Sequence, residues 1–346
     1  MAIVKNSYLV VILFLCGLVT SAQTITGLVL DHSNEQPLES VSIYYDGTTI
    51  GAVTNQEGYF TITSQIKTNA IVVVSYIGYE TKYFSQTELA NAKTIYLNEK
   101  AEALDPVIIE PDDWSRAKKL KYFRREFLGR GEAAEACKIL NEDQIQLVYS
   151  KSKNTLYAYC DQPVQIKNKH LGYRLNYKIV DFEVRFVDNR SGLIFVQGVY
   201  FAGTSNFSEL NPKRIKKRYR KTREEEYHGS LLEFMRALSQ KKLKEYQFST
   251  FIKSEGSRFF VPVDPYQYLI VQKQEGDLCK VTIKTDKLVV LNNQDAQSAL
   301  LPVEGFDTFY IDAYGIHSPP DKLLFSGVFG NERMAKLLPL DYKVEE

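Results

Sequence analysis

Short apolar segments recur between positions 24 and 98, and turns that contain glycine separate them. The turn signals include Asp46-Gly47, Glu57-Gly58 and Ile77-Gly78, where glycine allows the positive φ of a tight turn. Regular short strands with almost no helical periodicity predict an all-β sandwich or barrel, with Ile71–Val74 as its buried central strand. The candidate strands span 24–30, 41–45, 59–63, 70–76, 79–84 and 94–97.

Four motifs follow one another in this segment: G-x-V-x-D, P-L-x-x-V, T-N-x-x-G-x-F and S-Y-I-G-Y. They begin at Gly27, Pro37, Thr54 and Ser75. Together they resemble the carboxypeptidase regulatory-like domain over essentially all of residues 24–98. The resemblance implies a seven-stranded, transthyretin-like (prealbumin-like) β-sandwich. It also implies an accessory module that has no catalytic residues of its own.

Residues 1–22 have the pattern of a secretory signal peptide that is removed. Lys5 supplies the positive charge, Tyr8–Val19 is an apolar run too short to span a bilayer comfortably, and Thr20–Ala22 provides small residues for cleavage. We therefore expect export to the periplasm, or to the outer membrane or cell surface of a Gram-negative bacterium, with no transmembrane segment in the mature chain. An N-terminal membrane anchor and lipid attachment at Cys16 are the alternatives.

The sandwich, expected over 23–98, is followed by residues 99–111, which are rich in proline and acidic residues and predict a linker. Within it, Val107–Ile109 could add as a strand to a neighbouring sheet. The remaining residues, 112–346, form the second predicted domain.

Two helices are predicted in the second domain. One carries Trp114 to Phe127 on an apolar face, begins at a cap supplied by Asp112 or Asp113, and ends at Gly129. The other begins at a capping box, Ser230–Glu233. Strand patterns span 144–150, 155–160, 163–167, 171–187, 193–201, 258–261, 266–273, 278–284, 287–291 and 307–313. The fold class is therefore mainly β, with a larger mixed, mostly antiparallel β domain and a few helices behind the sandwich.

Several phrases of the second domain, including Tyr227–Ser230 and Leu337–Tyr342, are similar to the body of an uncharacterised family of secreted bacterial proteins. Those proteins pair this body with the regulatory-like sandwich. The resemblance implies no activity.

The mature chain is near neutral in total, which argues against a general nucleic-acid binder, although charge divides unevenly between its two parts. Residues 24–100 hold four basic and eight acidic residues, and the rest of the mature chain holds 38 basic and 34 acidic residues. The exception is Lys213–Arg223, where eight of eleven residues are basic and Glu224–Glu226 follow. We interpret this segment as a solvated, partly helical face, with contact to anionic lipopolysaccharide or an acidic glycan as the alternative. The candidate contacts with an anionic surface are Lys213, Arg214, Lys216, Lys217, Arg218 and Arg220.

Three cysteines remain after the signal segment: Cys137, Cys160 and Cys279. Cys137 and Cys160 are the candidate disulfide, because closing a loop of this length would stabilise the fold by about 3 kcal/mol. Three buried free thiols are the alternative.

An H-x-x-E motif at His32 and Glu35, with His170 downstream, invites comparison with zinc carboxypeptidases. It lies in the first turn of the sandwich, where little surrounding structure could orient metal ligands. No two of the four histidines have metal-binding spacing, so we expect no metal and no other cofactor.

Carboxylate pairs are the other candidates for chemistry. Asp307 with Asp312, or Asp181 with Asp188, could serve glycoside hydrolysis if their separations suited it. Signatures of a serine nucleophile and of a phosphate-binding loop are absent.

The leading hypothesis is therefore a non-enzymatic exported envelope protein, an accessory module that binds a protein partner at the outer membrane or cell surface. One alternative is a glycan-binding accessory protein, for which Tyr44, Tyr45 and Tyr59 are candidate contacts. The other is a peptidase or glycosidase with a site in 112–346.

Overall fold

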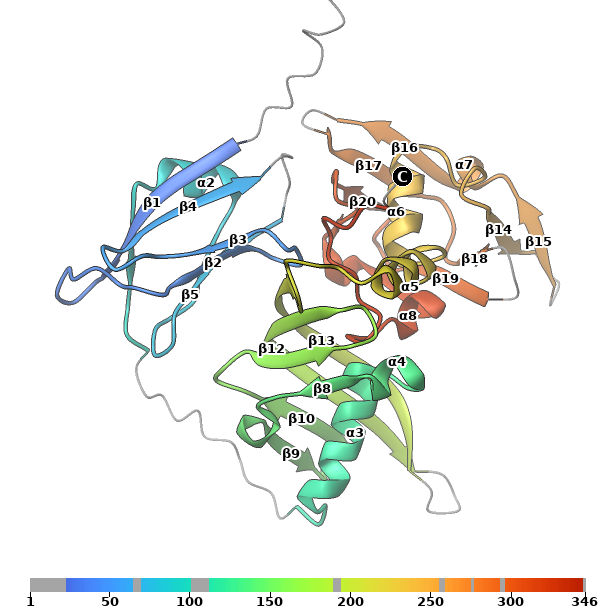
Figure 1. Ribbon diagram of the computed structural model, residues 1–346. Helices are drawn as coiled ribbons and strands as arrows, with labels where there is room; N and C mark the ends of the chain where they lie inside the picture. The colour runs from blue at the N-terminus through green and yellow to red at the C-terminus, as the bar shows by residue number, and fades with distance from the viewer. Residues whose placement is uncertain are drawn as a thin grey trace, which may run out of the picture.

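The computed structural model describes residues 23–64, 70–100, 112–188, 194–254, 259–274, 277–292 and 296–344. The predicted signal peptide, 1–22, and the predicted linker strand, Val107–Ile109, lie outside these ranges. Three lobes are visible in Figure 1, and each has its own cluster of buried hydrophobic side chains.

The first lobe, called the sandwich lobe here, consists of residues 23–100 without 65–69 and has the predicted seven strands. One sheet has the strand order β4-β1-β7 and the other the order β3-β2-β5-β6. The strands are β1 (Gln23–Asp31), β2 (Ser42–Tyr45), β3 (Gly51–Val53), β4 (Tyr59–Ser64), β5 (Val72–Ser75), β6 (Lys82–Phe84) and β7 (Thr94–Leu97), and one helix, α2 (Gln86–Asn91), precedes β7. The fold expected from the resemblance is therefore confirmed.

Alternation along β1 explains how the sandwich forms, because every second side chain from Ile25 to Asp31 points into the core. Val29 meets Ile43 of β2 and Val74 of β5 there, all fully buried. The short helix α2 is missing from the sequence expectation, although Ser85 and Glu88 form a capping box at its start.

The second lobe, the curved-sheet lobe, is a six-stranded antiparallel sheet covered on one face by α3 (Arg116–Leu128). Its strands run in the order β8-β11-β12-β10-β9, and β13 pairs with β12. The elements are α4 (Glu132–Glu135), β8 (Cys137–Ile139), η2 (Glu142–Gln144), β9 (Gln146–Ser150), β10 (Thr155–Tyr159), β11 (Val164–Asn168), β12 (Tyr173–Asp188) and β13 (Ile194–Glu209).

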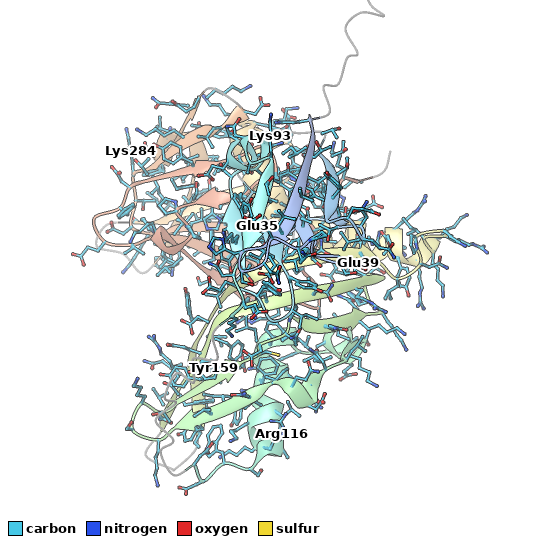
Figure 2. All side chains as sticks on the ribbon, turned by 90° about the vertical axis from the view of Figure 1, so that its left-hand side faces the viewer. Glu35, Glu39, Lys93, Arg116, Tyr159 and Lys284 are labelled. Atoms are coloured by element: carbon cyan, nitrogen blue, oxygen red, sulfur yellow. The ribbon has the colours of Figure 1, made fainter. Side chains whose placement is uncertain are left out.

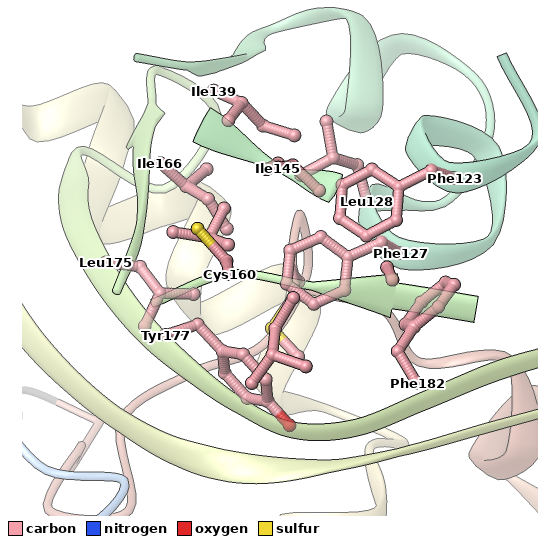
Figure 3. Close-up of a cluster of buried hydrophobic side chains, with 14 of the residues drawn as sticks. Phe123, Phe127, Leu128, Ile139, Ile145, Cys160, Ile166, Leu175, Tyr177 and Phe182 are labelled. Atoms are coloured by element: carbon pink, nitrogen blue, oxygen red, sulfur yellow. The ribbon is translucent and has the colours of Figure 1, made fainter. Parts of the chain in front are cut away.

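Aromatic side chains join α3 to this sheet. Figure 3 shows Phe123 and Phe127 above Tyr177 and Phe182, and the rings of Phe123 and Phe182 lie 4.9 Å apart. The predicted start of α3 is wrong: Ser115 caps the helix by accepting from the Lys118 amide, because Asp112 instead accepts from the Trp114 amide and from Lys119 Nζ.

The third lobe, the C-terminal lobe, holds two antiparallel sheets that share a core with α6 (Leu231–Ser239). Their orders are β15-β14-β18-β19-β22 and β16-β17-β20-β21. The other elements are α5 (Lys217–Tyr227), β14 (Phe248–Lys253), β15 (Phe260–Val263), α7 (Pro265–Tyr268), β16 (Leu269–Lys273), β17 (Cys279–Ile283), β18 (Leu288–Asn292), β19 (Ala296–Pro302), β20 (Thr308–Ile311), β21 (His317–Ser318), η4 (Pro320–Lys322), β22 (Leu323–Gly327) and α8 (Val328–Asn331).

The region 112–346, expected as one β-rich domain, thus has two hydrophobic cores. After α8 the chain returns to the curved-sheet lobe, where Met334 and Leu338 are buried in its core. This return ties the last residues of the chain to the sheet that also receives the sandwich lobe.

Candidate functional site

The turn Asp46–Thr49, between β2 and β3, connects the sandwich lobe to the rest of the molecule. The Gly47 amide donates to the Ser205 carbonyl at 2.8 Å, and the Phe207 amide donates to the Thr48 carbonyl at 3.0 Å. The Leu340 amide donates to the Gly47 carbonyl at 2.7 Å. The turn therefore acts as a short extra strand on the open edge of β13.

Asp46 is one of two acidic residues at this junction, and the other, Asp341, accepts from the Thr49 amide at 2.8 Å. The Asp46 carboxylate accepts from the Ser205 amide at 2.6 Å, and burial raises its pKa to about 6. Gly47 has φ +74°, and an added Cβ would lie 2.5 Å from the Leu340 side chain. The turn thus requires glycine at this position.

Arg236 of α6 holds the chain end that completes the junction. Its guanidinium donates to the carbonyls of Leu340 at 2.6 Å and Tyr342 at 2.8 Å. A third bond goes to the Tyr314 carbonyl at 3.1 Å. All three of these bonds go to main-chain oxygens.

The predicted basic segment divides into an exposed part and a buried part. Its six candidate contact residues are all exposed, on the loop before α5 and on the first turns of that helix. Arg223 is buried instead: it pairs with both oxygens of Glu209, at 2.8 and 2.7 Å, and lies 3.7 Å from the Tyr173 ring centroid. The segment is partly helical as expected, from Lys217 onward, and its contact with an anionic surface stays a prediction.

The cysteines do not form the candidate disulfide. Cys137, Cys160 and Cys279 are free thiols, as in the alternative of three buried thiols, although only Cys160 and Cys279 are buried and Cys137 is half-buried. Cys137 lies on β8 and Cys160 directly after β10, and β11 and β12 separate these strands. Three strand spacings of about 4.8 Å place the two cysteines well beyond the Cα distance of roughly 7 Å that a disulfide allows.

The H-x-x-E motif lies in the turn that follows β1, and Figure 2 labels Glu35 on the sandwich lobe. In the described ranges, no three His, Cys, Asp or Glu side chains are grouped so that they could hold a metal ion. The conspicuous acid of this turn is Asp31, which is buried. The Tyr79 hydroxyl and Ser33 donate to it and lower its pKa to about 2.

Two histidine–glutamate pairs are not predicted from the sequence: one joins the turn after β11 to α5, and the other joins the end of α5 to the start of α6. His170 Nε2 lies 2.8 Å from Glu226, which also pairs with Lys336 at 2.9 Å. His228 Nδ1 lies 2.8 Å from the buried Glu233. These contacts join helix ends to neighbouring segments.

The proposed carboxylate pairs differ in their surroundings. Asp307 is exposed before β20, whereas Asp312 follows that strand and accepts from the Tyr314 and Ile316 amides, both at 2.9 Å. Five residues of extended chain separate their Cα atoms by about 17 Å. Asp181 lies on β12 opposite Ala202, and Asp188 ends the same strand.

The three tyrosines considered for glycan binding also differ. Tyr44 and Tyr45 are buried, and the Tyr44 hydroxyl lies 3.2 Å from Thr204 of the curved-sheet lobe. Tyr59 is 58% exposed on β4. Two of the three rings therefore pack inside the molecule or at the junction.

The edge strand β15 presents the most conspicuous apolar surface of the C-terminal lobe. Phe259, Phe260 and Val261 are 77%, 40% and 39% exposed. Within the part of the chain that the structure describes, β15 pairs with β14 on one side and with no strand on the other. A groove of about 610 Å³ lies beside it, lined by Lys253, Phe260, Thr285, Asp286 and Lys287.

The fold of the sandwich lobe is a seven-stranded β-sandwich. Comparison with protein families agrees: residues 25–109 match the family model of the CarboxypepD_reg-like domain. The chain therefore carries a carboxypeptidase regulatory-like domain at its N-terminal end. The match continues past residue 98 into the predicted linker.

Comparison with curated proteins finds no match to this chain. Among the described residues, no helix is long and apolar enough to cross a membrane.

Proposed function

We propose that this protein is a non-enzymatic, exported envelope protein that binds a protein partner at the outer membrane or cell surface. The partner would add an extended segment to the open edge of β15, in the mode called β-augmentation. The export part of the proposal rests on the signal-peptide pattern of residues 1–22.

The apolar edge of β15 carries the proposal. Natural sheets protect open edges with charges, bulges or covering segments, because an apolar edge is a template for another strand. Here Phe259, Phe260 and Val261 are exposed together, and only Pro262 interrupts the run. Proline is tolerated in an edge strand, since it removes one amide from a single side.

The groove beside β15 indicates the chemistry of the partner segment. Lys253 and Lys287 line it, and Lys287 Nζ lies 5.9 Å from the Phe260 ring centroid. Asp286 is the acidic residue among the lining residues. A partner segment with both apolar and acidic side chains on the face toward this groove would place apolar groups on Phe260 and carboxylates beside the lysines.

Four charged side chains of region 112–346 already have partners within the protein, which supports a binding role over a catalytic one. His170, Glu226, Glu233 and Arg236 are engaged in contacts that hold helices and the chain end in place. An undetected hydrolase site in 112–346 stays an alternative prediction.

Site-specific photo-crosslinking in intact cells tests the proposal. A photoreactive residue at Val261 should yield one reproducible crosslinked protein in the envelope fraction. The matched control is Val180, which is 64% exposed on β12, and it should not yield this product. Equal products from both positions, or none from Val261, would contradict the proposal.

A further inference from the structure

Three basic residues stand in one row across the curved sheet. Lys138 of β8 is directly opposite Lys167 of β11, and Lys167 is directly opposite Arg174 of β12. Directly paired residues of antiparallel strands point to the same face of a sheet. The three cations therefore lie side by side, about 5 Å from strand to strand.

The row lies on the face that α3 leaves uncovered. The sequence neighbours Ile139, Ile166 and Leu175 are buried in the core beneath α3, so the three cations point the other way. Lys138 and Arg174 are exposed, and Lys167 is half-buried.

No described carboxylate forms an ion pair with any of the three cations. The nearest acidic residues that follow Arg174 on β12 are Asp181 and Glu183. Asp181 is seven residues from Arg174, which is about 23 Å along the strand. Like charges directly opposite one another destabilise a sheet. The row therefore costs folding stability, and an external anion would relieve that cost.

Polar groups and a hollow extend the row. Ser208 of β13 is opposite Arg174, and Asn206 is opposite Asn176. A hollow of about 260 Å³ lies there between β13 and the β2–β3 hairpin of the sandwich lobe, and its lining includes Asn206, Ser208 and Val53. The side chains of Asn206 and Ser208 make no hydrogen bond to the described residues, so they can bind hydroxyl groups.

We propose that this row and the adjoining hollow bind an acidic polysaccharide whose sugars each carry a carboxylate. A chain-like ligand fits because the cations form a line, and because sugar hydroxyls match the amide and hydroxyl groups at its end. A flat lipid surface fits less well, since the β2–β3 hairpin stands beside the row. This ligand site is separate from the β15 edge and goes beyond the proposed function.

Calorimetric titration of the full mature chain with oligogalacturonate tests this inference, with a neutral oligosaccharide of the same length as the control ligand. Binding should occur for the acidic ligand alone and should weaken as salt is added, because the contacts are ionic. Lys167→Gln should weaken binding about fivefold, and the triple variant with Lys138→Gln and Arg174→Gln about a hundredfold, at roughly one charge-assisted contact per cation.

Thermal unfolding separates a binding role from a structural one. Lys167→Gln should leave the Tm unchanged or raise it, because it removes repulsion between like charges. The matched control is Lys280→Gln, since Lys280 lies on strand β17 of another sheet, and it should retain full binding.

Three results would overturn the inference: no binding of oligogalacturonate, equal binding of the neutral ligand, or unchanged binding by the triple variant. Binding only to vesicles that contain phosphatidylglycerol would assign the row to lipid headgroups and would also overturn it. Crosslinking at Val261 reports on the C-terminal lobe, so failure there and failure here can be told apart.

Discussion

The edge strands β13 and β15 differ in whether another segment of the chain covers them. The edge of β13 is covered, because the turn Asp46–Thr49 uses the amides of Ser205 and Phe207 and the carbonyl of Ser205. The edge of β15 is open within the described part of the chain, and Phe260 is exposed beside it. The chain thus completes one edge with its own residues and leaves the other available to an incoming strand.

The polar groups at the edge of β13 are used within the fold, whereas the apolar groups at β15 are not. At β13, main-chain groups are satisfied by segments from distant parts of the sequence, and Leu340 adds a further bond. At β15, apolar side chains remain exposed although an interior position would stabilise them more. We therefore connect β13 with internal assembly and β15 with a partner.

The largest expected effect comes from breaking the covered edge. Gly47→Val should lower the free energy of unfolding by about 3 kcal/mol, because it combines a positive φ with a clash against Leu340. Urea denaturation measures it. Gly78→Val is the matched control: Gly78 has φ +86° and no atom within 4 Å of an added Cβ, so it should cost clearly less. Equal losses would contradict this prediction, because the close contact between position 47 and Leu340 would then add nothing to the loss.

Removing the Arg236 side chain, which binds the C-terminal segment, should lower the free energy of unfolding slightly less. Arg236→Met deletes charge-assisted bonds to the carbonyls of Leu340 and Tyr342 and should cost about 2 kcal/mol in urea denaturation. Arg124→Met is the control, because Arg124 is half exposed and pairs with Glu142 at the surface. That variant should lose less than about 1 kcal/mol. Similar losses from both variants would contradict the stabilising role of the bonds from Arg236.

A pH dependence of the covered edge comes next. The pKa of Asp46 is raised to about 6, so the folded state holds this proton more tightly than the unfolded chain does. Stability from Asp46 is therefore full below about pH 4 and is lost as the pH rises to about 6. The wild type should lose about 2 kcal/mol more over this interval than Asp46→Asn. Parallel pH profiles in urea denaturation would refute the assignment.

The smallest effect on stability is expected at the open edge. Val261→Lys should change the free energy of unfolding by less than about 0.5 kcal/mol, because the side chain is exposed. It should nevertheless abolish capture of the envelope partner, since a lysine opposes strand addition. Val180→Lys should leave capture intact. Retained capture by the Val261 variant would move the partner site elsewhere.

Local pattern predicts much of this fold. The spacing of glycine turns predicts the sandwich strands, and apolar spacing predicts α3 and α6. The Asp46-Gly47 turn is also predicted, but its partners are not. Ser205 and Leu340 are about 160 and 290 residues away in the sequence, and no periodicity reports such contacts.

The candidate sites also show that contacts between residues far apart in the sequence cannot be predicted from local pattern. The basic segment Lys213–Arg223 is evident because its charges are nearly consecutive, whereas Lys138, Lys167 and Arg174 are single charges in three separate strands. Only the register of the sheet brings them together. The expected Cys137–Cys160 bridge is wrong for the same reason, because closeness in sequence says nothing about how many strands lie between two residues.

Hydrogen exchange resolved to single amides compares the two edges most directly. In the free mature protein, the amides of Ser205 and Phe207 should exchange slowly, whereas the outward-facing amides of β15 should exchange close to the rate of an unprotected chain. Gly47→Val should speed exchange at Ser205 and Phe207 and leave β15 unchanged. Equally slow exchange at both edges of the wild type would contradict the proposed role of β15, because its edge would then not be available to a partner.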